Sequence, residues 1–357
     1  SLPRDMVELP SQVMENWAYE KECLDLFAEH FETKEKIPAD LMKKIKDSAN
    51  FHEGRNTLRQ LSLALLDMAW HSVLTLAFDT QHAGEHPRTN LVQRHHQGAL
   101  RVQKALYPES GEQQGICHVI MLYPPAGIAL GDKLDIDIGV KHHAHAVITT
   151  PGANKWYGNL PSYTANKQTD DSPSVKKTQK NQETQENSNS CAVQNVTVYL
   201  QDDSRFEWLP QENCFYNASF AHATNQFFIS PAASIIAWEI NLLGREHHGE
   251  RYSTGEMRLS NLFWRVDEQP KLLLADTLHH CAEHDWFGSA VGLNNHSVFA
   301  SLWVVPSVDA QKHLIEWVKQ LRLFIDHHSL PVSCTQTGEV MIIRYLGDDV
   351  RQCFDSF

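Results

Sequence analysis

The stretch Val196-Thr197-Val198-Tyr199-Leu200 lies between Asn195 and the pair Asp202-Asp203. β-Branched and aromatic residues bounded by turn-forming residues are typical of a β-strand. Apolar runs with similar boundaries recur from about residue 73 onward: Val73–Phe78, His118–Tyr123, Ala144–Thr149, Phe227–Ser230, Ile235–Ile240 and Met341–Tyr345. The sequence therefore predicts that this part of the chain is mainly β.

Two regions have the spacing of helices instead. One is Asp309–Ile325, whose apolar residues fall on one helical face. The other is residues 1–72, where Asp40–Asp47 follows the helix-start signal of Pro38, and Asn56–His71 has apolar residues at three- and four-residue steps. The predicted fold class is thus mainly β with few helices, preceded by a short all-α segment, with a domain boundary near residue 72.

Composition and charge exclude several classes of protein. The chain has 357 residues, of which 42% are hydrophobic, enough for two or three domains with cores of their own. A net charge of −13 does not suit a general nucleic-acid binder, which needs a surplus of Lys and Arg on one face. We find no apolar run of membrane-spanning length, and Ser1–Pro10 has none of the features of a signal peptide.

The cysteines and one polar stretch carry further expectations. Seven cysteines are widely scattered and none forms C-x-x-C, which indicates reduced thiols in a cytoplasmic protein. Residues 166–189 consist almost wholly of polar residues, which bury too little apolar surface to offset the entropy of ordering. We expect this stretch to be a disordered loop inserted between two strands.

The N-terminal segment contains an unusual string, Glu8-Leu9-Pro10-Ser11-Gln12 continuing to Glu15-Asn16-Trp17. This string, and Leu66–Ser72 further on, resemble the M3 family of zinc oligopeptidases. In that family the residue at the position of Glu8 is the third zinc ligand, and the other ligands come from an H-E-x-x-H helix. The chain has no H-E-x-x-H, because His52-Glu53 is followed by Gly54-Arg55-Asn56. One carboxylate cannot hold a catalytic zinc.

We therefore expect residues 1–72 to be an M3-like fragment without peptidase activity. The alternatives are an M3-type zinc metallopeptidase, which would rest on residues 3–72 and on Glu8, and a misassembled reading frame in which neither activity is intact.

Four strings in the remainder of the chain resemble the UreD/UreH family of urease accessory proteins. They are Arg94–Glu109, Pro124–Asp137, Thr149–Tyr157, and Glu207–Glu212 with its downstream continuations at Trp238-Glu239, Leu243–Arg245, Gly249–Arg251 and Arg344–Gly347. The residues that carry the family pattern are Arg101, Gly127, Gly131, Pro151, Gly152, Lys155, Trp208, Pro210, Gly244, Arg245, Arg344 and Tyr345. The resemblance predicts a UreD-like domain over residues 74–357.

Three positions depart from the family pattern. Ala126 and Leu130 stand where the family usually has glycine, and Asn217 stands where it commonly has Asp. If the two glycine positions require a positive φ, each replacement costs about 1 kcal/mol or more.

The resemblance implies a non-enzymatic scaffold that acts with UreF and the GTPase UreG to deliver nickel to apo-urease. Nickel would be held transiently in an internal tunnel, by oxygen and imidazole ligands that release it. The candidate path carboxylates are Asp132, Asp135, Asp137, Glu207 and Glu212. Asp135 and Asp137 share a strand face. The alternative is that Asp132 stabilises a turn and that the other two are solvated.

Histidines offer a second candidate site for the metal. His279-His280-Cys281 with His284 is the best local cluster, and its i, i+4 spacing brings His280 and His284 together only in a helix. The alternative is that these are ordinary surface histidines. The chain has no Gly-rich phosphate loop, so the GTPase must be a partner.

Overall fold

A computed structural model describes residues 21–38, 40, 41, 44, 71–81, 88–110, 115–158, 191–282, 284 and 286–357. The chain divides into two units, Ser1–Met68 and Ala69–Phe357. In the first unit, α2 spans Lys21–Phe27, and Glu29 forms an isolated β-bridge with Lys36. Glu8, most of the predicted helix Asn56–His71 and the polar stretch 166–189 lie outside the described residues.

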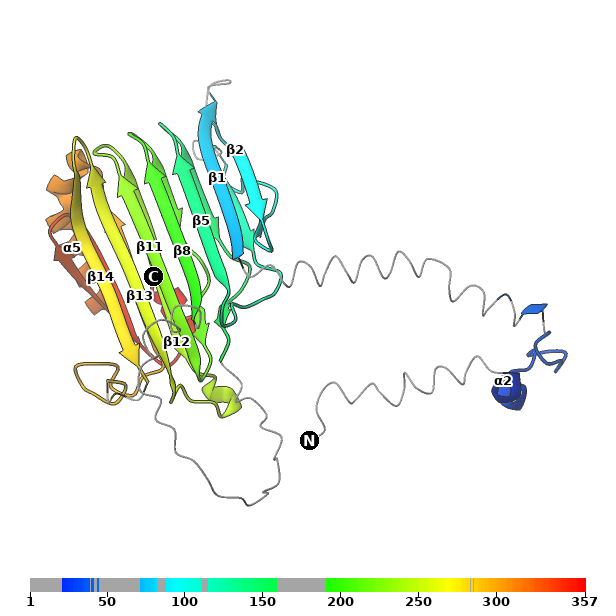
Figure 1. Cartoon of the computed structure of the whole chain (residues 1–357). Coiled ribbons are helices and arrows are strands. Elements are labelled where there is room, and N and C mark those ends of the chain that lie inside the picture. The colour runs from blue at the N-terminus through cyan, green and yellow to red at the C-terminus, as the bar shows by residue number, and fades with distance from the viewer. Residues whose placement is uncertain are drawn as a thin grey trace, which may run out of the picture. The chain divides into compact units, whose positions relative to one another are not determined.

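The second unit is mainly β, as the sequence predicts, and is built from two sheets. Seven strands lie side by side in the first sheet (Figure 1). In spatial order they are β14 (Pro270–Cys281), β13 (Gly255–Val266), β11 (Ser219–Ile229), β8 (Ala192–Leu200), β5 (Lys133–Val140), β1 (His71–Gln81) and β2 (Arg88–Gln97). The assignment of His71 and Ser72 to a helical segment was wrong, because both residues are paired in β1 with β5.

Ten strands form the second sheet. Its main path is β16 (Val332–Thr337), β17 (Val340–Gly347), β15 (Val298–Val305), β12 (Ser234–Leu243), β9 (Arg205–Trp208), β6 (His145–Thr149), β4 (Cys117–Leu122) and β3 (Arg101–Val102). Two short strands lie off this path: β10 (Asn213–Phe215), which pairs with β12, and β7 (Asn154–Trp156), which pairs with β10.

The chain passes back and forth between the two sheets. Successive strands β5, β8, β11 and β13 belong to the first sheet and are parallel neighbours, while β4, β6, β9 and β12 do the same in the second sheet. Parallel neighbours need a long crossover connection. Here strands of the facing sheet lie within these connections, so the chain winds in coils between the two sheets.

Alternation within each strand creates one core between the sheets. In β11, for example, every second residue from Ser219 to Ile229 is buried, and the residues between them are exposed or half-buried. Phe227 of the first sheet stacks on Phe263, and Phe263 lies 5.6 Å from the ring of Trp303 in the second sheet. β17 of the second sheet begins with four consecutive buried residues, Val340–Ile343, which explains why the apolar stretch there was readable in the sequence.

The predicted helix Asp309–Ile325 is confirmed in part. The 3₁₀ helix η5 spans Val308–His313, and the α-helix α5 follows over Leu314–His328. Leu314, Val318 and Ile325 are buried, in line with the apolar face read from the sequence. Two further short helices are η4 (Glu246–His248) and α6 (Val350–Ser356), the latter capped by Asp349, whose side chain accepts from two backbone N–H groups.

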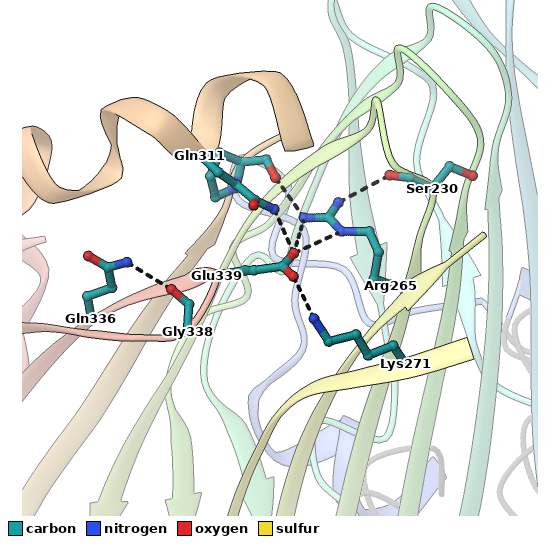
Figure 2. Close-up of polar contacts among 8 residues, drawn as sticks. Ser230, Arg265, Lys271, Gln311, Gln336, Gly338 and Glu339 are labelled. Carbon is teal, nitrogen blue, oxygen red and sulfur yellow. Dashed lines mark hydrogen bonds and ion pairs between the residues drawn. The ribbon is translucent and has the colours of Figure 1, made fainter. Parts of the chain in front are cut away.

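A buried ion pair joins the sheets near α5. Arg265 of β13 has a side chain that is only 7% exposed, and it pairs with Glu339, in the turn between β16 and β17, at 3.3 Å. Figure 2 shows the same carboxylate receiving hydrogen bonds from Lys271 at 2.9 Å and from Gln311 at 2.6 Å. Arg265 also donates to the carbonyl of Ser230, so its charge is compensated on several sides.

Candidate functional site

Glu239 lies in the interior between the two sheets. Alternate residues of β12 point inward. The first two are the apolar residues Ile235 and Ala237, and the next is Glu239, which is 8% exposed. A carboxylate in such a position is costly unless it is hydrogen-bonded. The burial of Glu239 therefore needs a functional or structural explanation.

The sequence around Pro210 creates the space beside Glu239. β9 pairs with β12 only over Ser234–Ala237, and β10 pairs with β12 only from Asn241 onward. Pro210 lies between β9 and β10 in the sequence. Because proline has no backbone N–H, it cannot donate a hydrogen bond that would continue the pairing with β12. Its carbonyl instead accepts a hydrogen bond from the indole N–H of Trp238 at 2.7 Å. The sheet therefore opens where Glu239 lies.

Two amide side chains hold the carboxylate. Asn241 donates to Oε1 at 3.1 Å from the same strand, and Asn261 of the facing sheet donates to Oε2 at 3.3 Å. Asn225 in turn donates to Asn261 at 2.7 Å. Among the described side chains, Asn225 Oδ1 is a buried acceptor that lacks a hydrogen-bond partner. Glu239 therefore sits in a polar interior that still has an unused oxygen ligand.

The chain of amides continues away from Glu239 along the second sheet. Asn213 donates to the side-chain amide oxygen of Asn241 at 3.1 Å. Asn154 donates to the side-chain oxygens of Asn213 at 3.2 Å and of Gln194 at 3.1 Å. Trp156 also donates its indole N–H to Asn213. Together with Glu239, Asn225 and Asn261, polar groups from six different strands thus form one connected network through the core.

Two cavities meet at Glu239. A cavity of about 290 Å³ is lined by Glu239 together with Asn154, Gln194, Asn213 and Asn225, and a larger one of about 630 Å³ is lined by Glu239 together with other side chains. The further polar lining of the larger cavity includes Asn241, Asn261, Asp276, Ser301 and Arg344. The carboxylate is thus shared by two spaces on the inner side of the sheets.

Arg344, a family-pattern residue, lines the larger cavity. Its guanidinium pairs with Asp276 of β14 at 2.8 Å and donates to the hydroxyl of Ser301 at 2.9 Å. The indole N–H of Trp303 donates to the same Asp276 carboxylate at 2.9 Å. Since Asp276 and Arg344 belong to different sheets, the pair connects the sheets at this cavity.

Burial raises the pKa of Glu239, and the hydrogen bonds from Asn241 and Asn261 only partly oppose this effect. The negative charge of Asp276 raises it further. The carboxyl group therefore binds a proton more readily than a surface glutamate does. A cation that enters the cavity competes with that proton.

All four family-like strings meet at the smaller cavity, although they are far apart in the sequence, and Leu100 belongs to the first of them. Its lining includes Ala126-Gly127, residues 150–155, and Trp208 with Pro210, in addition to Trp238-Glu239. Pro151, Gly152 and Lys155 belong to the second of these groups. The strings that carry the resemblance are therefore parts of one interior wall.

Two small residues set the shape of that wall. A Cβ on Gly127 would lie 2.5 Å from the Tyr157 ring and 2.9 Å from the Lys155 carbonyl oxygen, so only glycine fits. Ala126 has φ +62°, the left-handed region that glycine favours, which agrees with the expected strain at this position. Leu130, the other residue that stands in place of a family glycine, has a negative φ and is not strained in this way. The next residue, Gly131, has the positive φ, at +89°.

The predicted carboxylates of the 132–137 region lie elsewhere. Asp132 accepts a hydrogen bond from the backbone N–H of Ala129 at 2.8 Å, as a turn residue does. Asp135 and Asp137 do share a face of β5, but it is the face that points away from the core. Asp135 pairs there with Lys133 and His71.

The two aspartates differ in charge behaviour. Burial acts to raise the pKa of Asp135, but hydrogen bonds from Asn195, Lys133 and His71 outweigh it and leave the pKa lowered. Burial and the neighbouring Asp135 raise the pKa of Asp137. Both effects follow from contacts on the outer face of the sheet.

Glu207 and Glu212 are also away from Glu239. Glu207 is half-buried and pairs with His145 at 2.8 Å. Glu212 accepts a hydrogen bond through its main-chain carbonyl from the N–H of Asn154. Of the described residues that line the two cavities, none is one of the five carboxylates predicted from the sequence.

The histidine cluster has a different geometry from the helical one considered in the sequence. His279, His280 and Cys281 end the strand β14, so adjacent side chains point to opposite faces. His280 is buried at 2% exposure, and burial, aided by the positive charges of His284 and His279, lowers its pKa. His279 and His284 are exposed. His280 and His284 therefore do not share a helical face.

The remaining family-pattern residues stabilise turns. Arg101 donates to the carbonyls of Gly98 and Leu100, and Arg245 pairs with Glu250 while lying 4.2 Å above the ring of Tyr216. Gly244 has φ +75° and a hypothetical Cβ would lie 2.6 Å from the Glu250 carbonyl oxygen.

Two turns near the ends of strands complete the pattern. Tyr345 donates to the carbonyl of Asp349 at 2.9 Å. Asn217 accepts from the backbone N–H groups of Ser253 and Thr254, at 2.8 and 3.0 Å, so the amide oxygen supplies the acceptor at this position.

In the sequence, Glu239 stood out only as part of a string that resembles the UreD family. One signal for its importance was present, namely a charged residue inside the apolar run Ile235–Ile240. A charge in a strand with no polar face is unusual enough to mark a functional candidate.

Comparison with known proteins agrees with the residues that meet at this site. The model of the family described as UreD urease accessory protein matches residues 71–357, and that of peptidase family M3 matches residues 1–83. Urease accessory protein UreD 2 of Psychrobacter cryohalolentis is 38% identical over 313 residues, covering 81% of this chain and 93% of the relative. Urease accessory protein UreD of Acinetobacter baumannii (strain ACICU) is 35% identical over 290 residues, covering 81% and 87%.

A third relative, urease accessory protein UreD of Cupriavidus metallidurans, is 33% identical over 289 residues, covering 79% of this chain and 85% of its own. In the part of the chain that the structure describes, no helix combines the length and the apolar character needed to cross a bilayer. With a family match over residues 71–357 and relatives aligned over most of their length, the chain belongs to the UreD family of urease accessory proteins.

Proposed function

We propose that this chain is a non-enzymatic urease maturation factor that passes nickel through its interior, with Glu239 as the central ligand. The observation that carries the proposal is the position of Glu239 between two cavities, as a buried carboxylate held by the amides of Asn241 and Asn261. A buried carboxylate that is held by two amides keeps a negative charge that a cation can compensate.

The ligands at this position suit a transient cargo. Glu239 supplies carboxylate oxygens, and Asn225 and Asn241 supply amide oxygens. Nickel binds more tightly to imidazole and thiolate than to such oxygen ligands, so an all-oxygen path holds the ion weakly enough to release it. The raised pKa of Glu239 adds a second means of release, because a returning proton displaces the cation.

We infer the partners from the family. UreD-like proteins are implied to act with UreF, with the GTPase UreG and with apo-urease, in the cytoplasm. The absence of a phosphate-binding loop from the sequence is consistent with a GTPase supplied by a partner. No enzyme activity is proposed for this chain, and nickel is its cargo and not a tightly bound cofactor.

The test is complementation of a urease-producing strain that lacks its own UreD. The Glu239→Gln variant keeps the size of the side chain but removes its charge. We expect it to co-purify with UreF while urease activation falls by at least tenfold. Glu316→Gln makes the same chemical change on the exposed face of α5 and serves as the matched control, with activation unchanged.

Two results would contradict the proposal. One is full activation by Glu239→Gln. The other is loss of activation by Glu207→Gln or Asp135→Asn with Glu239→Gln unaffected, which would move the path to the carboxylates outside the two cavities. Failure of the unmodified chain both to bind UreF and to support activation would reject the maturation role itself.

For residues 1–72 we propose an M3-like fragment without peptidase activity. The match of the M3 family to residues 1–83 supports the relationship, and the missing H-E-x-x-H argues against catalysis. Chelator-sensitive hydrolysis of a fluorogenic oligopeptide in the presence of zinc would overturn this.

A further inference from the structure

Three metal-binding side chains gather on the outer face of the seven-stranded sheet, at one end of the antiparallel pair β13–β14. Glu256 of β13 lies directly opposite Cys281 of β14 in the register. His279 lies two residues before Cys281, so the pleat places both on the same face. His280, between them, points into the core. The three side chains therefore converge by strand geometry, outside the interior cavities.

The distances suit a single metal ion. His279 Nε2 lies 2.9 Å from Glu256 Oε1 and 3.7 Å from Cys281 Sγ, and the ligand atoms of all three residues lie within 4.8 Å of one another. Ligands of a tetrahedral zinc-like ion, with bonds of about 2.0–2.3 Å, are separated by about 3.3–3.8 Å. Small rotations of the side chains are enough to reach that arrangement.

Glu256 is half-buried, and its carboxylate already contacts two cationic or imidazole side chains, Arg258 and His279. The guanidinium of Arg258 lies 2.6 Å from Oε1 and occupies part of the place that an ion would take. Its side chain is 54% exposed, and exposed ion pairs are weak, so it can move away at little cost.

A second cysteine and histidine lie on the neighbouring strands. Cys191 Sγ is 3.5 Å from Nδ1 of His222, and His222 is the β-partner of Arg258. Burial raises the pKa of the Cys191 thiol, which disfavours the thiolate that a metal requires. His222 belongs to β11, the strand directly next to β13, and Cys191 immediately precedes β8, so this pair is a neighbouring competing site.

We propose that Glu256, His279 and Cys281 form a surface site for a borderline-soft divalent transition-metal ion of the zinc and nickel class. One nitrogen, one thiolate and one carboxylate supply three ligands and leave a fourth position for water or an incoming ligand. The bound ion would join the edge strand β14 to β13. This site is separate from the interior path and goes beyond the function proposed above.

The test uses the full chain, stripped of metal and titrated with Co²⁺ and then with Zn²⁺. A thiolate ligand gives Co²⁺ a near-ultraviolet charge-transfer band, which oxygen ligands do not. Among the described residues, the linings of the two cavities contain no cysteine, so a thiolate band does not come from an ion bound in those cavities. We expect one Co²⁺ per chain to give the band, and Zn²⁺ to displace it.

Variants assign the ligands. We expect Cys281→Ser to abolish the band, and His279→Gln and Glu256→Gln each to weaken Co²⁺ binding by tenfold or more. His95→Gln alters an exposed histidine on β2, the opposite edge strand of the same sheet, and should leave binding unchanged. Circular dichroism checks that each variant is folded.

Several outcomes would overturn the proposal. They are the absence of the band in the unaltered chain, its persistence in Cys281→Ser, and its loss in Cys191→Ser, which would assign the ion to the neighbouring pair. A loss of urease activation in Glu239→Gln with the band retained would support the interior path and the surface site separately.

Discussion

Glu239 of the ten-stranded sheet accepts a hydrogen bond from Asn261 of the seven-stranded sheet at 3.3 Å. This contact places a carboxylate at the point where the two sheets and the two cavities meet. Because the partner is an amide and not a cation, the charge of Glu239 is stabilised without being neutralised. The site therefore keeps an affinity for a cation.

The raised pKa of Glu239 predicts a pH-dependent stability. The unfolded chain ionises this residue near its usual pKa of 4.5, whereas the folded chain holds the proton to higher pH. Folding stability is thus lost progressively as the pH rises from about 4.5 through the folded-state pKa. Glu239→Gln removes that loss. The difference in unfolding midpoint between the variant and the unaltered protein should therefore shift in favour of the variant as pH rises, and parallel curves would contradict the assignment.

The pair Arg265–Glu339 predicts the opposite pH behaviour. Burial acts to raise the pKa of Glu339, but hydrogen bonds from Lys271 and Gln311 and the charge of Arg265 outweigh it and lower the pKa. Its stabilising effect is complete above about pH 4.5 and is lost as the pH falls through the folded-state pKa.

Substitution tests the same pair directly. Glu339→Gln should cost roughly 2 kcal/mol at pH 7, since it removes charge-assisted hydrogen bonds and leaves the Arg265 charge undercompensated. Urea denaturation measures the difference, with Glu316→Gln on α5 as the control. Equal losses in both variants would show that the ion pair makes no special contribution.

Gly127 is predicted to be intolerant of a larger side chain. A methyl group there meets the ring of Tyr157 and, at 2.9 Å, the carbonyl oxygen of Lys155, which belongs to the backbone and cannot rotate away. Gly127→Ala should destabilise the protein by about 1–3 kcal/mol and reduce urease activation by distorting the cavity wall. Gly152→Ala is the matched control, because nothing lies within 4 Å of the added atom although Gly152 lines the same cavity.

Ala126 is expected to gain from the reverse change. Its φ of +62° costs an alanine about 1–2 kcal/mol, and a glycine there avoids that strain but loses about 0.4–1 kcal/mol through greater freedom of the unfolded chain. Ala126→Gly should therefore stabilise the protein by roughly 0.5–1 kcal/mol. Chemical denaturation gives the sign, and a destabilised variant would mean that the methyl group packs usefully.

Much of the fold was readable because local patterns decide it. The apolar runs predicted strands that are present, and the apolar face of Asp309–Ile325 predicted a helix whose α-helical part is α5. The start of β1 was misread because His71 and Ser72 follow a stretch with helical spacing. Pairing with β5, a strand about 60 residues later, decides that these two residues are extended.

The candidate site was harder to predict from the sequence, because contacts between strands decide it and local patterns do not. Asp135 and Asp137 share a face, as their spacing predicts, but spacing does not say whether that face is inside or outside. The cluster of Glu256, His279 and Cys281 depends on the antiparallel register of β13 and β14. In the sequence, only the adjacent His279–Cys281 part was visible.

The sequence by itself determined the class of fold, the strings shared with the UreD family and the absence of a peptidase motif, because each is a property of neighbouring residues. Only the tertiary structure decided that those strings form one cavity wall, and that Glu239 is buried between two cavities with Asn225, Asn241 and Asn261 around it. Hydrogen bonds and burial of this kind arise from contacts between strands far apart in the chain. The coiled path of the backbone sets those contacts, and no local pattern specifies them.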